Sequence, residues 1–527
     1  MHADALYQEL NKHWLSTSRA LLGEDVGPMA EYEKWLSQAT SGLVFRKSAQ
    51  SGKPVAFVLP FYSQSAPAYS FDEVDLGKKA EPLSINEIKD IDSILGALEG
   101  RVSYTGGISL GTSKLVEKST DVVDSFYIYN SAQVSFSKYI AYCYNFEYST
   151  NMFGCVHFGE SNFCISSYNN GKITRCLEMH NCRKCSDSHY CHNLYASQNA
   201  MFSFNLRNAN FVIGNIKLPK DRYAELKKKL LGELAGMLRK DKSLPSLLGL
   251  ASRPPDKSSL AKIAPLRKPE SRKPAGTGFA EEKFGELTKI LFGKQLKGIA
   301  QYEKWLRGYV NLTKAVRSAF GDEIEVADYA DYFAYPEARL VKEQDAFLLG
   351  DALRFDGAFL ENPSFSEAGR QIGKIAYFYA GHNGGIVENA VESHVNIECS
   401  NCYRSTLNLN SKNCVHSFYS LESDTVFGCN SARKSSYLLR CCQATRCARC
   451  FEVDSSMECT DCYFCHDCEN VRDSMFCFNT KNKTNAIWNV ELPQDKYRLV
   501  KSAVLGELAS RLEKGKSLDL SIFNLKA

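Results

Sequence analysis

The chain has 527 residues, of which 44% are hydrophobic, 24% charged and 12% aromatic, and its formal net charge is +4 at pH 7. This length is too great for one ordinary core and predicts two or more domains, and the balance of residue types excludes a disordered or fibrous chain. A net charge this small for the length does not by itself require a nucleic-acid partner.

The sequence also predicts where the protein works. No stretch reaches the roughly 18 to 20 uninterrupted apolar residues that a membrane helix needs, and the opening MHADALYQELNKHWL lacks the basic start and apolar middle of a signal peptide. We therefore expect a cytoplasmic protein that does not contact a membrane. Thiols are kept reduced in that compartment, so the 20 cysteines are not expected to form a disulfide framework.

Two halves of the chain repeat each other. The segment EYEKWL at 31–36 returns as QYEKWL at 301–306, and residues 173–223 match 447–497 without a gap, with 18 identities in 51 positions. The match indicates two tandem copies of one module. Apolar residues at helical spacing predict helices at the start and at the end of each copy.

The predicted parts follow in this order: a mixed helical segment (1–100), a strand-rich region (101–216) and a closing helix (217–251), a linker (252–278), then the same three parts again (279–370, 371–490 and 491–527). The linker is rich in Pro, Ser and Lys, with seven basic residues against two acidic ones. Such a composition buries little apolar surface and predicts a flexible spacer that could touch RNA phosphates.

The middle of each copy contains short aromatic and β-branched runs separated by Ser, Asn, Gly and Cys, which is typical of many short strands with tight corners. In the second copy a short unit recurs every 12 to 19 residues. It consists of Cys or Ser, two further residues, Cys or Ser again and then an apolar residue, as in CSNCY from Cys399 and CTDCY from Cys459. We therefore expect a mainly β (α+β) fold of two tandem cysteine-rich β-solenoid modules, each capped by helices.

The cysteines have two main interpretations. Buried Cys behaves as a small apolar residue, and its exchange for Ser between the copies favours packing inside the stack. The alternative is zinc, because two Cys-x-x-Cys pairs can complete a tetrahedral thiolate site. The candidate ligands are Cys447, Cys450, Cys459, Cys462, Cys465 and Cys468 in the second copy and Cys176, Cys182, Cys185 and Cys191 in the first. An iron–sulfur cluster fits less well, since Cys459 to Cys468 departs from ferredoxin spacing.

The two copies do not share a complete ligand set. Ile173 and Ser188 stand opposite Cys447 and Cys462, so a site built from the Cys-x-x-Cys pairs of the second copy would exist in that copy alone. His192 and His466 do align, each directly after an aligned cysteine. Neighbours in a strand point to opposite faces, so these histidines are interpreted as structural or partner-contacting rather than catalytic.

The end of the second middle region, CYFCHDCENVRDSMFCFNTKNKTNAIWNVELPQDKY, and its partner in the first copy resemble a family of uncharacterised cysteine-rich repeat proteins of archaea and candidate-phylum bacteria. In that family, cysteine-rich units run into an Asn-containing segment and then a helix, as at 489–497 here. The resemblance implies a repeat architecture and implies nothing about a substrate.

The function these features favour is a non-enzymatic binding or scaffold protein that presents two β-solenoid surfaces to a protein or ribonucleoprotein partner. The sequence contains no Walker loop, no HExxH and no supported GxSxG, which weighs against an enzyme, and no cofactor is expected. One alternative is a zinc-binding structural or regulatory module. A second is an enzyme whose active site lies in a solenoid groove.

Overall fold

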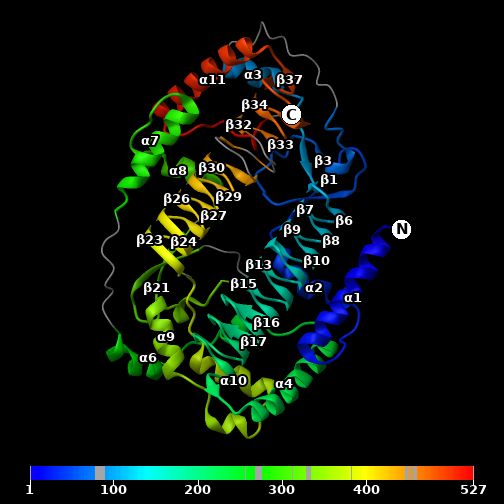
Figure 1. Cartoon of the computed structure of the whole chain (residues 1–527), viewed down its shortest axis with the longest axis vertical. Coiled ribbons are helices and arrows are strands. Elements are labelled where there is room, and N and C mark those ends of the chain that lie inside the picture. Colours follow the sequence, from blue (N-terminus) through cyan, green and yellow to red (C-terminus); the bar gives the residue numbers. More distant parts are fainter. Residues whose placement is uncertain are drawn as a thin grey trace.

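The computed structural model describes residues 2–77, 90–255, 257–267, 276–310, 313–327, 334–381, 383–445, 450–452, 454, 460–463 and 465–525. It is a mixed α/β fold with many parallel strands and flanking helices (Figure 1). The sequence predicts a mainly β fold with flanking helices. The structure contains the strands and the flanking helices, but its many helices make the fold mixed rather than mainly β. No helix in these ranges is both long and apolar enough to span a membrane.

The first half begins with α1 (His2–Leu22) and α2 (Glu33–Leu36), followed by the hairpin β1 (Val44–Lys47) and β2 (Pro54–Phe57), then β3 (Ala68–Ser70), α3 (Ile91–Leu98) and β4 (Tyr104–Gly106). The strands from β5 (Ser109–Leu110) to β20 (Ile216–Lys217) form one 16-stranded sheet, which we call the first array. Helix α4 (Lys220–Asp241) closes this half.

The second half has the same order of parts. Helices α7 (Gly278–Phe292) and α8 (Glu303–Leu306) precede the hairpin β21 (Thr313–Arg317) and β22 (Glu323–Ala327), and α9 (Glu343–Ala352) and α10 (Phe365–Ile375) precede the strands. The second array runs from β23 (Asn383–Val391) to β37 (Val490–Glu491), and α11 (Gln494–Gly515) follows it. Between the halves lie α5 (Leu247–Leu250) and α6 (Lys257–Ile263).

The strands of both arrays are short and pair in parallel with strands twelve residues away. In the first array, Lys114 of β6 (Lys114–Glu117) lies opposite Phe126 of β8 (Phe126–Tyr129), and Phe126 lies opposite Lys138 of β10 (Lys138–Ala141). Every third residue here has a positive φ, for example 60° at Tyr127 and 42° at Asn130. These left-handed residues bend the chain at regular intervals, so the side chain that follows each one turns inward.

The inward positions hold either apolar side chains or short polar ones. Ile128, Val134 and Ile140 are fully buried between the strands. At the corners, the hydroxyl oxygen of Ser131 accepts a hydrogen bond from the backbone N–H of Cys143 at 3.0 Å, and the hydroxyl donates to the Tyr129 carbonyl at 2.8 Å. The corner side chain therefore satisfies backbone groups that would otherwise be buried without a partner.

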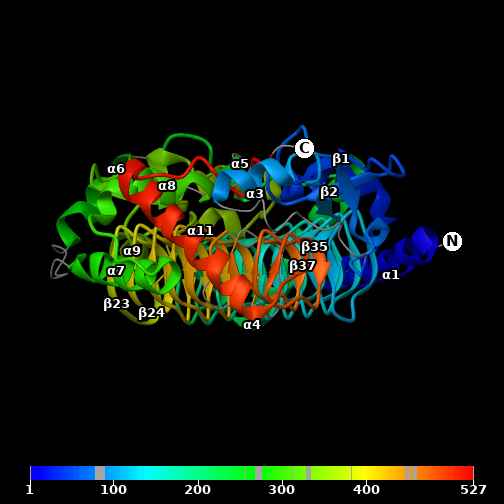
Figure 2. The ribbon, with the colours of Figure 1, turned by 90° about the horizontal axis from the view of Figure 1, so that it is seen from above.

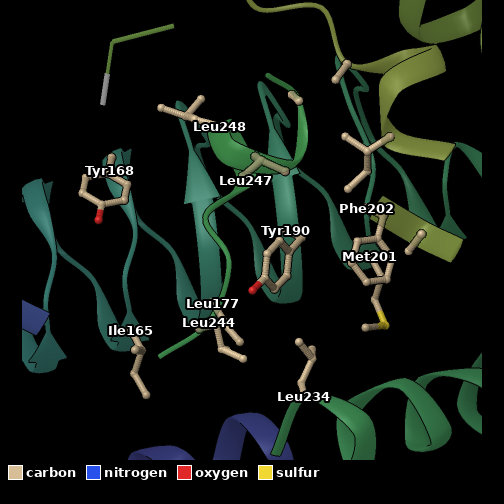
Figure 3. Packing of buried hydrophobic residues seen from close by; sticks show 14 of the residues in the cluster. Ile165, Tyr168, Leu177, Tyr190, Met201, Phe202, Leu234, Leu244, Leu247 and Leu248 are labelled. Carbon is tan, nitrogen blue, oxygen red and sulfur yellow. The ribbon is translucent and has the colours of Figure 1, made fainter. Parts of the chain in front are cut away.

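Long helices cover the outer faces of the arrays (Figure 1). Helix α1 packs along strands β10 (Lys138–Ala141), β14 (Asn162–Ile165) and β16 (Thr174–His180). Near the end of the first array, Leu234 of α4 and Leu247 of α5 pack close to Leu177 and Tyr190 (Figure 3). These contacts bury the apolar faces of the helices and the outward apolar side chains of the array together.

The two halves interlock through the segments that precede each array. The backbone N–H of Thr105 in β4 donates to Nε2 of His466 at 3.1 Å, and the N–H of Tyr379 donates to Nε2 of His192 at 3.0 Å. The segment before each array thus reaches the end of the other one. The arrays lie side by side, and α3, α5 and the hairpin β1–β2 lie on one side of them (Figure 2).

The segment expected to be a spacer contains ordered contacts with the second half. Within it, α6 spans Lys257–Ile263, and the guanidinium of Arg267 pairs with the carboxylate of Asp345 at 2.9 Å and with that of Asp322. Arg267 is therefore neutralised by the protein itself. Residues 268–275 of this segment lie outside the described residues.

Candidate binding groove

A groove of about 430 Å³ runs along one corner at the start of the second array. It lies over β23, β24 (His394–Tyr403), β26 (Lys412–Val415) and β28 (Asp424–Phe427). Its lining residues are Ile386, Glu388, Glu398, Cys399, Ser400, Asn410, Ser411, Lys412, Glu422, Ser423, Asp424 and Ser436. The groove is open to solvent and is large enough for a short segment of a partner chain.

The twelve-residue register explains why these side chains gather. Parallel pairing places Glu388 opposite Ser400, Ser400 opposite Lys412, and Lys412 opposite Asp424, so these residues form one row. Glu398, Asn410 and Glu422 have the same spacing and form a second row, while Cys399, Ser411 and Ser423 lie between the rows. Strand repetition thus produces two lines of outward side chains with a floor of small inward ones.

The groove is acidic. Its lining contains the carboxylates of Glu388, Glu398, Glu422 and Asp424 but only one cationic side chain, Lys412. The ammonium of Lys412 pairs with Asp424 at 3.1 Å, and Glu398 accepts a hydrogen bond from the backbone N–H of Ile386 at 3.3 Å. Lys412 neutralises only the carboxylate of Asp424, so three of the four carboxylates keep their charge. They give the groove a negative potential.

A pair of thiols lies beneath this groove. Cys399 lines the groove although it is only 3% exposed, whereas Cys402 is fully buried. A hydrogen bond from the Cys402 thiol lowers the pKa of Cys399, helped by backbone N–H groups such as that of Ser411. Hydrogen bonds with Cys399 and Cys414 raise the pKa of Cys402. The Cys399 thiol donates to the carbonyls of Ile397 and Asn408, both at 2.9 Å, so it points into the array.

The corresponding surface of the first half carries different chemistry. The rings of Phe136 and Tyr148, twelve residues apart, stack at 5.0 Å with an interplanar angle of 10°. Lys434 of the second half places its ammonium 5.8 Å from the centre of the Phe136 ring and 5.7 Å from that of Tyr148. Exposed aromatic rings with a cation from the other half beside them form this face, so the two halves present unlike surfaces.

The candidate zinc ligands of the first half are buried and hydrogen-bonded to the backbone. The thiols of Cys182, Cys185 and Cys191 donate to the carbonyls two residues before them at 3.3, 3.2 and 3.3 Å, and that of Cys176 does so at 3.5 Å. None of the seven cysteines in this half forms a disulfide. Over the described part of the chain, no three His, Cys, Asp or Glu side chains gather in a metal-binding arrangement.

The candidate ligands of the second half are described only in part. Cys450, Cys462 and Cys465 are fully buried. Phe451 pairs in parallel with Tyr463, which places Cys450 and Cys462 at equivalent positions of neighbouring segments. Cys447 and Cys459 lie outside the described residues, as does the side chain of Cys468 in β33 (His466–Glu469).

The aligned histidines join the two halves. His192 and His466 each accept the backbone N–H described above, and both are fully buried. Burial, together with nearby His180, holds the pKa of His192 well below its usual value, so the ring stays neutral and acts as an acceptor. Neither histidine lies at the groove.

Comparison with models of known protein families, with curated proteins and with solved structures finds no match to this chain. The groove itself is therefore the feature from which a function can be inferred. Sequence reasoning singled out CSNCY from Cys399 as a repeat unit but did not find the groove. A strict twelve-residue register would have aligned Glu398 with Glu422 and revealed the acidic row.

Proposed function

We propose that the protein is a non-enzymatic binding or scaffold protein whose two duplicated arrays are β-solenoids, and that the acidic groove of the second array binds a basic, extended polypeptide segment. The observation that carries this proposal is the pair of carboxylate-bearing rows over a groove of about 430 Å³. A rigid array with repeated outward positions suits an extended partner better than a compact small molecule.

The spacing supports a polypeptide partner. Neighbouring strands lie about 4.8 Å apart, so Glu398 and Glu422, two strands apart in their row, are separated by about 10 Å. An extended polyproline II chain has three residues per turn and rises about 3.1 Å per residue, so basic side chains three residues apart lie on one side of the chain and span about 9 Å. We therefore expect the partner to carry Lys or Arg at every third position.

The charge of the groove distinguishes this partner from RNA. Carboxylates repel phosphates, and Arg267 of the basic segment between the halves is already paired with Asp322 and Asp345. A protein segment is thus favoured over a ribonucleoprotein contact at this site. The aromatic surface formed by Phe136 and Tyr148 already has the ammonium of Lys434 beside it, so the groove of the second half is the better surface for a basic partner.

The test is a fluorescence-anisotropy titration of the full chain with three labelled ligands of matched length: a peptide with Lys at every third residue, the same peptide with Glu in place of Lys, and a single-stranded RNA. The proposal predicts binding of the basic peptide alone, with an affinity that falls as salt increases. Equal binding of the acidic peptide, preferential binding of RNA, or no binding of the basic peptide would overturn it.

A zinc-binding role is the second candidate, because Cys450 and Cys462 occupy equivalent positions and Cys447 and Cys459 have the same spacing in the sequence. Two such pairs on neighbouring segments suit a four-thiolate site. Elemental analysis of protein purified anaerobically tests it. Stoichiometric zinc that is lost in C450S but kept in C176S supports the site, and wild-type protein without zinc contradicts it.

A further inference from the structure

A second pocket, of about 840 Å³, lies between helices α3 and α11 and the chain that follows α11. Helix α3 belongs to the first half, whereas α11 and residues 517–525 belong to the second, so the pocket forms where the two halves meet (Figure 1). The backbone N–H of Ile91 donates to the Glu507 carboxylate at 3.0 Å, and the Arg511 guanidinium pairs with Asp92 at 2.5 Å. These bonds hold α3 beside α11.

The wall of this pocket is aliphatic. None of its lining residues is aromatic, and Ile91, Leu98 and Leu508 are at most 1% exposed, so they form its floor. Flexible hydrocarbon side chains suit a hydrocarbon ligand, and the volume lies within the range of small-molecule sites. We call this cavity the leucine pocket, and its apolar lining includes Ile91, Leu95, Leu98, Leu508, Leu518 and Leu525.

The equivalent corner of the first half is filled by the protein itself. There the backbone N–H of Phe365 in α10 donates to the Glu233 carboxylate of α4 at 2.7 Å, in the same way that α3 is held to α11. Helix α10 carries Gly369 where α3 carries Leu95, and a Cβ at Gly369 would lie 3.2 Å from Cδ2 of Leu250. The leucine pocket therefore belongs to one of two matching corners, and local sequence differences account for it.

Charged side chains of both signs stand at the rim of the leucine pocket. They are Lys514 at the end of α11, Glu99 directly after α3, and Asp519 in the chain that follows α11. Within the described part of the chain, none of these three has an ion-pair partner, whereas Arg511 is already paired with Asp92. One positive and two negative charges are thus available to a ligand.

We propose that the leucine pocket binds a free amphiphile with one hydrocarbon chain and a zwitterionic head group, as in a lysophospholipid. The chain packs against the leucines, the ammonium of the head group faces Glu99 and Asp519, and its phosphate faces Lys514. The carboxylates repel a purely anionic head group, and Lys514 repels a purely cationic one. This inference does not depend on the proposed function, because the leucine pocket and the acidic groove share no lining residue.

The experiment is isothermal titration calorimetry of the full-length protein with octyl, decyl and dodecyl phosphocholine, each below its micelle concentration. The affinity should increase about fourfold for each added CH₂ group, because each one leaves water for the apolar wall. Dodecanoate and dodecyltrimethylammonium have chains of similar length but a single charge. Both should bind more weakly than dodecyl phosphocholine.

Two variants with a matched control locate the ligand. Gly96 lines the pocket, and no atom lies within 4 Å of a Cβ built there, so the leucine of G96L would occupy part of the cavity. G96L should weaken binding of dodecyl phosphocholine about tenfold, since it takes the space of several CH₂ groups. Gly506 of α11 has equally open surroundings outside the pocket, so G506L should bind like the wild type. K514Q should weaken binding of dodecyl phosphocholine but not of dodecyltrimethylammonium.

The proposal is wrong if dodecyl phosphocholine does not bind, if G96L and G506L bind it equally, or if either singly charged amphiphile binds more tightly. Sedimentation of the protein with phosphatidylcholine vesicles that is lost in G96L would show contact with a lipid surface and would contradict a free ligand. The basic-peptide titration reports on the acidic groove alone. Failure of the amphiphile to bind therefore leaves the proposed function intact, and failure of the peptide to bind leaves the leucine pocket intact.

Discussion

Replacing Ser137 by Ala removes one of the inward hydroxyl groups that form hydrogen bonds with the backbone of the first array. The hydroxyl oxygen of Ser137 accepts the backbone N–H of Ser149 at 3.0 Å, and the hydroxyl donates to the Ser135 carbonyl at 2.8 Å. Ser137 and Ser149 are both buried, so no solvent replaces the lost partner. A buried N–H left without an acceptor costs about 1–3 kcal/mol, and S137A should lower the free energy of unfolding by that amount.

The matched variant is S137C. Cys143 already performs this role at another corner, where its sulfur accepts the N–H of Cys155 at 3.4 Å and its thiol donates to the Ala141 carbonyl at 3.2 Å. Urea denaturation followed by circular dichroism should therefore show a smaller loss for S137C than for S137A. An S137A midpoint equal to that of the wild type, or a loss of stability in S137C as large as that in S137A, would refute this role of the Ser137 hydroxyl.

Two further predictions concern acid stability and close packing. Burial lowers the pKa of His157 and of His189 to about 3, so only the unfolded chain takes up their protons as pH falls below about 6.5. The free energy of unfolding is therefore highest above about pH 6.5. It should fall by about 2 kcal/mol for each histidine between pH 6.5 and 5, since one pKa unit is worth about 1.4 kcal/mol. Denaturation midpoints at both pH values test this, and H157Q should remove only the share of one histidine, because burial also lowers the pKa of His192, His394 and His416. At Gly428, with φ of 64°, a Cβ would lie 2.5 Å from the Leu306 carbonyl oxygen, so G428A should cost about 1–3 kcal/mol by overpacking. Gly159 has no atom within 4 Å of that position, and G159A should unfold like the wild type, whereas equal midpoints for G428A and G159A would contradict the packing argument.

Local patterns in the sequence were sufficient to locate the long helix that closes each half. The spacing of Tyr223, Leu226, Leu230, Leu234 and Leu238 predicts one apolar face, and the structure places all five in α4 as buried residues. Pro219 before this helix also fits, because proline is compatible with a helix start. Such features depend on neighbours three or four residues away, which a single sequence records directly.

The register of the arrays was harder to read. Every third residue points inward, but those positions accept residues as different as Ser131, Ile140, Cys143 and Phe146. Mixed side chains of this kind hide the twelve-residue spacing, which is why the unit appeared to recur every 12 to 19 residues in the sequence. Without the register, Glu398 and Glu422 could not be placed in one row.

The interlocking of the halves was also beyond local reasoning. Thr105 and His466 are separated by 361 residues, and their hydrogen bond follows from the arrangement of the two halves rather than from either segment alone. The same holds for Asn479, whose amide donates to the Ser103 carbonyl at 3.2 Å. Sequence reasoning interpreted the histidines as structural or partner-contacting, and their partner is the other half of the same chain.

The most direct test of the binding account compares the double variant E398Q/E422Q with the control E160Q. Glu160 is an exposed carboxylate of the first half that pairs with Lys172 at 3.1 Å, so E160Q also removes a negative charge from the surface. Titration with the basic peptide across a range of salt concentrations should show at least a tenfold weaker affinity and a shallower salt dependence for E398Q/E422Q, and wild-type behaviour for E160Q. Equal affinities and equal salt dependence for both variants would contradict the assignment of the groove as the binding site.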